Sequence, residues 1–134
     1  MRLLILSITL LFSTPAWAAN NWERVARHGN GNIVYVDFDN MRQNDGYIYF
    51  WSLTDYIEPE PYDDDGVMSH KTYFKVDCDL RRHKVLKTIW FLQPMGFEQH
   101  GKSSAGFDRW LKFPPNSIGA ERERLVCERA SSGQ

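Results

Sequence analysis

A chain of 134 residues that is 43% hydrophobic and 25% charged fits one globular domain, and it excludes disordered and collagen-like architectures. Its formal net charge of −1 gives no basic excess, so we expect no nucleic-acid partner.

Residues 1–18 have the pattern of a secretory signal peptide. Arg2 supplies the positively charged start, Leu3–Phe12 form a short apolar core, and Ala16–Ala18 is a small-x-small cleavage site. Because the apolar run is too short to cross a bilayer as a helix, we expect cleavage after Ala18 and no membrane span.

Residues 19–134 should then form a single mature domain. Ala19 takes the first mature position, where a bacterial lipoprotein needs a cysteine, so no lipid anchor is expected. We therefore expect an exported protein that resides in the periplasm, or is secreted or held at the cell surface.

The next elements are strands with alternating or aromatic-rich patterns. We predict them at residues 21–28, 33–38, 47–56, 71–78 and 84–92. The polar stretch 39–46 is expected to hold a short helical turn capped by Asp39 or Asn40. Residues 58–66 and 93–112 are expected to be loops, and the second has room for a short edge strand.

The fourth strand organises the chain. Its inward positions alternate from Met68 and His70 to Val76 and Cys78, which points Cys78 toward the core. A helix is predicted for Ile118–Arg129, capped by Asn116 or Ser117. Its apolar face is narrow and comprises Ile118, Leu125 and Val126, with Arg122 as a possible member and Cys127 near the edge.

An exported chain with two cysteines favours a disulfide, here Cys78–Cys127, although two buried free thiols are the alternative. Closing a loop of roughly 50 residues would stabilise the fold by about 4 kcal/mol in the chain-entropy model.

Catalytic and metal-binding patterns are weak. The four histidines lack metal-ligand spacing, and no serine follows a nucleophile pattern. Asp63–Gly66 resembles part of a calcium loop, but Pro61 and Thr72 occupy ligand positions, so a solvated loop is favoured over a weak divalent site. Asp37 and Asp39 fit capping roles better than a paired-carboxylate site. We expect no enzyme activity, no metal and no cofactor.

Two features favour binding instead. The basic cluster Arg81, Arg82, His83 and Lys84, followed by Lys87, is either a patch for an acidic partner or a solvated hairpin end. Aromatic residues near loops are the expected anchors for a protein partner: Tyr56, Tyr62 and Phe97. An exposed sheet edge also allows a homodimer.

Several spaced residues together resemble the surface-adhesin protein E-like domain family of Gram-negative bacteria. They are Trp22, Tyr35–Asp37, the aromatic third strand, Ser69, Asp77–Cys78, Arg81–Arg82, Trp110, Pro115–Ser117 and Cys127. The resemblance implies an α+β fold: one antiparallel sheet of about six strands, with a C-terminal helix packed on it and disulfide-linked to it.

The resemblance also implies function. It implies an exported, non-catalytic adhesin that contacts host extracellular-matrix proteins of the vitronectin and laminin kind. The alternative is a periplasmic structural or inhibitory partner of an envelope protein, because a shared fold does not fix the partner.

Overall fold

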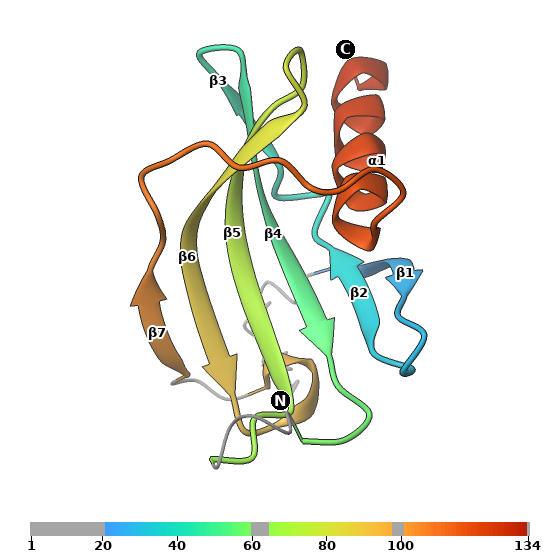
Figure 1. Cartoon of the computed structure of the whole chain (residues 1–134), viewed down its shortest axis with the longest axis vertical. Coiled ribbons are helices and arrows are strands. Elements are labelled where there is room, and N and C mark those ends of the chain that lie inside the picture. The colour runs from blue at the N-terminus through green and yellow to red at the C-terminus, as the bar shows by residue number, and fades with distance from the viewer. Residues whose placement is uncertain (1–20, 60–64, 98–100, 134) are drawn as a thin grey trace, which may run out of the picture.

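The alternation of apolar and polar residues builds one antiparallel sheet, shown in Figure 1 as a computed structural model that describes residues 21–59, 65–97 and 101–133. The strands run in the order β1-β2-β4-β5-β6-β7, and β3 pairs with β4. Their bounds are β1 (Glu23–Arg27), β2 (Ile33–Val36), β3 (Arg42–Asn44), β4 (Tyr47–Asp55), β5 (Ser69–Asp77), β6 (Arg82–Phe91) and β7 (Lys102–Ala105). A short 3₁₀ turn, η1 (Pro94–Gly96), follows β6, and the helix α1 (Ile118–Ser132) closes the fold.

The central strands β4 and β5 place one set of apolar side chains on the face that α1 covers. Phe50 pairs with Phe74 and Ile48 with Val76. These residues form the core together with residues of β2 and α1: Val36, Val126 and Cys127. Figure 1 shows α1 at the end of the sheet that carries β3 and the turn between β5 and β6. The single antiparallel sheet with a C-terminal helix is thus confirmed.

The prediction of a short helical turn within residues 39–46 is wrong. The buried carboxylate of Asp37 accepts hydrogen bonds from the backbone N–H and the side-chain amide of Asn40, at 3.3 and 2.7 Å. Asp45 and Gly46 then both take positive φ, 52° and 80°, as a tight hairpin turn requires. Arg42–Asn44 is therefore folded back along Tyr47–Tyr49 as β3.

The connection expected at 79–83 is also too long, because β6 already begins at Arg82. The loop 93–112 contains an edge strand, β7, which pairs with β6. The edges β1 and β7 leave one side of each strand unpaired within the described sheet. Pairing of such an edge with a second copy stays a prediction.

The helix begins where its cap predicts and ends later than expected. The Ser117 side chain accepts a hydrogen bond from the Ala120 N–H at 3.1 Å, and the helix continues past Arg129 to Ser132. A disulfide joins Cys78, at the end of β5, to Cys127 on α1, with 5.8 Å between the Cα atoms. The predicted disulfide is confirmed. No helix within the described residues has the length and hydropathy of a membrane span.

Candidate functional site

The face of the sheet that points away from α1 carries a row of aromatic rings. Because Phe50 and Phe74 point toward the helix, their strand neighbours point the other way. The rings of Trp51 and Tyr73 stack with centroids 4.9 Å apart, and Tyr49 lies 6.2 Å from Tyr73. These half-buried rings form a continuous surface across β4 and β5.

Cations lie over two further rings on the same face, those of Tyr47 and Trp110. The Lys75 ammonium is 4.3 Å from the ring centre of Tyr47 and 5.7 Å from that of Trp110. The guanidinium carbon of Arg82 and the ammonium of Lys84 also lie over the Trp110 ring, at 4.5 and 5.0 Å from its centre. Cation–π contacts of this kind hold the charged groups at fixed positions. We call this surface the aromatic–cationic face: Tyr47, Tyr49, Trp51, Tyr73, Lys75, Arg82, Lys84 and Trp110.

The predicted basic cluster is divided between two sides of the sheet. Arg82 and Lys84 point to the aromatic–cationic face, where they pair with Asp77 and Asp108, each at 2.9 Å. Arg81 is exposed in the turn with a φ of 49°. His83 is only 3% exposed and points to the core. The structure therefore places three of the four cluster residues where a partner has access to them.

The two acids beside the cluster are held in their charged forms. Burial acts to raise the pKa of the Asp77 carboxyl, but hydrogen bonds from the Leu80 N–H and the Arg82 guanidinium lower it overall. A hydrogen bond from Lys84 lowers the pKa of Asp108. The Lys84–Asp108 pair involves a fully exposed carboxylate, so it is weak and open to exchange with a partner.

The predicted aromatic anchors do not gather in one place. Tyr56 lies on the helix side of the sheet, where its hydroxyl shares a hydrogen bond with Nδ1 of His70. Phe97 is 80% exposed, as expected of an anchor near a loop. Tyr62 lies outside the described residues. Sequence reasoning did not predict Trp110, which is half-buried, as part of a binding surface.

Tyr56 lines a cleft of about 390 Å³ between the sheet and the start of α1. The polar residues at this cleft include His28, His70 and Arg122, and its apolar walls include Phe74 and Phe113. This size is in the usual range for small-molecule sites. The sequence offered one signal for this cleft: Arg122 shares a helical face with the apolar Ile118.

Burial shifts the titration of His70. Desolvation, followed by the charges of Arg122 and His28, lowers its pKa to about 4 from a usual value of 6.5. Between these two values the unfolded chain binds a proton that the folded chain does not, so stability falls as pH decreases from about 6.5 to about 4. The upper limit of this loss is about 3 kcal/mol.

We expect His70→Gln to remove this contribution. The difference in free energy of unfolding between the variant and the unchanged protein should therefore vary with pH between pH 6.5 and 4, and be constant above pH 7. Urea unfolding at a series of pH values measures it. Parallel stability curves for the two proteins would show that His70 titrates normally.

A buried acid and histidine form a second polar contact that sequence reasoning missed. Glu123 is 4% exposed, and its Oε2 lies 3.7 Å from Nδ1 of His83. Within the described part of the chain, neither atom has a hydrogen-bond partner. The His83 ring stacks on Phe113 with centroids 3.8 Å apart. This pair lies inside the fold, so it acts on stability.

The remaining candidate sites have structural roles or lie outside the described chain. Asp37 is buried at the turn, whereas Asp39 is exposed and bonds Asn21, so the two carboxylates do not share an environment. In the calcium-like stretch Asp63–Gly66, Asp63 and Asp64 lie outside the described residues. Across the described ranges, no group of three His, Cys, Asp or Glu residues is placed to hold a metal ion.

An antiparallel sheet with a disulfide-linked C-terminal helix defines a small α+β domain whose distinctive surface is aromatic and cationic. The sequence profile of the surface-adhesin protein E family matches residues 22–128, which is most of the chain. The chain belongs to this family and is an adhesin-like protein. No curated protein matches it significantly.

Solved structures of Haemophilus influenzae protein E share the fold. Its crystal form II aligns with a TM-score of 0.62 at 14% identity, and the alignment covers 96% of this chain and 100% of that one. A second structure of Haemophilus influenzae protein E aligns with a TM-score of 0.58 at 12% identity, covering 88% and 92%. At this level of identity the likeness concerns the fold.

Proposed function

We propose that this chain is an exported, non-catalytic adhesin that binds a host extracellular-matrix protein through the aromatic–cationic face. The observation that carries the proposal is the gathering of Tyr, Trp, Lys and Arg side chains around Trp110. Tyr, Trp and Arg are the residues most enriched among the strongest contacts of protein interfaces. Membership of the surface-adhesin protein E family supports the same proposal.

The geometry of the face suits recognition of an acidic partner. Lys75, Arg82 and Lys84 converge on one indole ring, and their long side chains are already ordered by it. A partner carboxylate can replace the exposed Asp108 at Lys84 with little loss of free energy, because an exposed ion pair contributes little to stability. Preordered side chains lower the entropy cost of binding.

Export is supported by the disulfide between Cys78 and Cys127. Disulfides persist in oxidising compartments such as the periplasm and the extracellular space. The signal peptide proposed for residues 1–18 lies outside the described residues, and its cleavage is tested by the N-terminal sequence of the protein isolated from cells.

The proposal predicts that reversing the charges of Arg81, Arg82 and Lys84 to glutamate weakens binding by at least about tenfold, since charged contacts at the centre of an interface are often among the strongest. Affinity for immobilised vitronectin and laminin, measured at low and physiological salt, gives the result. Trp110→Ala should weaken binding similarly without changing the net charge.

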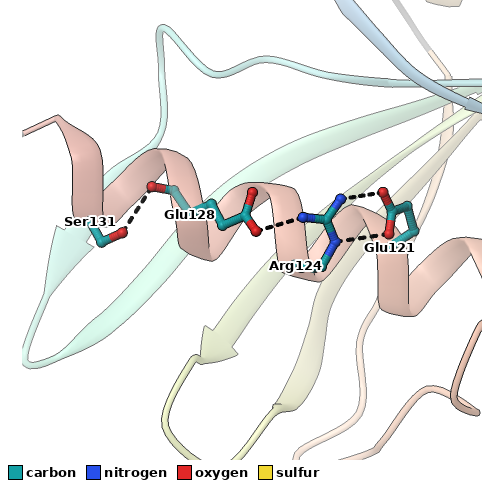
Figure 2. A network of polar contacts seen from close by, with 4 residues as sticks. All are labelled: Glu121, Arg124, Glu128 and Ser131. Atoms are coloured by element: carbon teal, nitrogen blue, oxygen red, sulfur yellow. Dashed lines mark hydrogen bonds and ion pairs between the residues drawn. The ribbon is translucent and has the colours of Figure 1, made fainter.

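Arg124→Ala provides the matched control. Arg124 lies on the exposed side of α1 and pairs with Glu121 and Glu128 on the same helix (Figure 2). The hydrogen bonds that Arg124 donates, first to Glu121 and then to Glu128, raise the pKa of its guanidinium. Removing this cation should leave binding unchanged. If affinity at low salt survives the triple reversal, the aromatic–cationic face is not the binding surface. If the protein captures envelope proteins and no matrix protein, it has the periplasmic role instead.

A further inference from the structure

The cleft on the helix side of the sheet contains a buried cation that makes no direct ion pair with another described residue. Arg122 is 8% exposed, and its Nη1 donates a hydrogen bond to Oγ of Ser52 at 3.1 Å. That hydroxyl in turn donates to the Tyr35 carbonyl at 2.9 Å. Nε of Arg122 is buried and has no hydrogen-bond partner among the residues that the structure describes. Among the ion pairs of the described residues, none includes Arg122.

The guanidinium is nevertheless held in one position. Its carbon lies 4.3 Å from the ring centre of Phe74 and 5.3 Å from that of Phe113. Desolvation, opposed by a smaller effect of the Glu123 charge, lowers the pKa of Arg122 to about 10, so the side chain remains charged at neutral pH. Burying a charge without a counter-charge is costly, and binding an anion there recovers part of that cost.

The cleft has the composition of an anion site with an apolar wall. No aspartate or glutamate is among the described residues that line it. Asn30 and Asn32 already accept backbone hydrogen bonds through their amide oxygens, from Asn32 and Ile57, so their amide N–H groups are what they can offer a ligand. Val34 and Ile118 add apolar surface.

The charge balance selects a singly charged ligand. Of the described residues that line the cleft, Arg122 is the one that is cationic at every physiological pH, since burial keeps His70 neutral there. A dianion such as phosphate would keep an unpaired negative charge in a partly buried site. A carboxylate has one charge and two oxygens, which suits the forked donors of a guanidinium.

We propose that this cleft binds a monoanionic carboxylate attached to a small apolar body, with the carboxylate on Arg122 and the body against Phe113 and Ile118. A free organic acid and the C-terminal carboxylate of a peptide share this chemistry. The cleft lies on the opposite side of the sheet from the aromatic–cationic face, so the inference stands or falls separately from the proposed function.

Calorimetric titration of the full oxidised protein tests the inference with four organic probes and with inorganic phosphate. Phenylacetate and a short peptide ending in a free phenylalanine carboxylate represent the two sources. Phenylacetamide and the amidated peptide have the same apolar bodies without the charge. We expect saturable binding of at least one carboxylate, and binding of its amide at least about tenfold weaker, because a charge-assisted hydrogen bond is lost.

Two variants of His28, which lines the cleft, test the site without changing Arg122 itself. His28→Glu adds a carboxylate that competes for Arg122 and should weaken binding by at least about tenfold, whereas His28→Gln should not. Equal affinity for acid and amide, absence of saturable binding by both carboxylates, tighter binding of inorganic phosphate, or full affinity in His28→Glu would overturn the inference.

Discussion

Replacing Cys127 with alanine is expected to lower the free energy of unfolding by about 2–5 kcal/mol. The disulfide to Cys78 closes a loop of 49 residues, and without it α1 rests on a narrow apolar face of which Val126 is the most buried member. The melting temperature should fall by on the order of 10 °C, since each kcal/mol shifts it by several degrees in a domain of this size. Thermal and urea unfolding measure both quantities.

The design of this experiment separates the cross-link from the packing of the cysteine side chain. Cys78→Ala and the double variant Cys78→Ala/Cys127→Ala should be about as unstable as the single variant, because either change removes the same bond. Reduction of the unchanged protein should give a similar loss. Identical melting of the oxidised and reduced protein would contradict the prediction.

Substituting His83 with leucine is expected to cost about 3–5 kcal/mol, because it leaves the buried Glu123 side chain without the imidazole that it contacts. The leucine also replaces a ring that stacks on Phe113. Urea unfolding at pH 7 gives the free energy of unfolding of the variant and of the unchanged protein.

A second substitution shows whether the buried carboxylate causes the loss. In His83→Leu/Glu123→Met the charge is gone and an apolar side chain of similar size takes its place, so most of the stability should return. If the double variant is as unstable as His83→Leu, the loss comes from packing around Phe113, and the account of the buried pair is wrong.

The parts of the fold that the sequence predicts are those governed by local pattern. The alternation along residues 68–78 is a feature of the chain itself, so it predicts both the direction of Phe74 and the core-facing register of Cys78. The start of α1 depends on one hydroxyl, that of Ser117, and was predictable for the same reason.

The direction of the basic residues was not predictable, because it depends on an irregularity between two strands. The register of β5 and β6 shifts between Tyr73 and Phe74, where Tyr73 pairs with Lys87 but Phe74 pairs with Val85. Because of this shift, the β6 residues from Arg82 to Val85 point to the opposite sides of the sheet from those that strict alternation would give. It places His83 in the core and leaves Lys84 on the aromatic–cationic face.

The polar residues of the cleft were hidden for a different reason. Helical periodicity treats a charged residue as exposed unless its surroundings are known. Arg122 is buried because the ring of Phe74 and the hydroxyl of Ser52, far away in the sequence, meet it in the folded chain. Glu123 is buried because His83 lies opposite it. Such contacts follow only from the packing of α1 on the sheet.

The central claim is that a protein partner covers the aromatic–cationic face, and oxidative footprinting tests it directly. Hydroxyl radicals modify accessible aromatic side chains, and mass spectrometry locates the modified residues. In complex with a matrix protein, Trp110, Tyr47 and Tyr73 should be oxidised less than in the free protein, while Tyr56 in the cleft should be unchanged. Unchanged oxidation of Trp110 together with protection of Tyr56 would contradict the account.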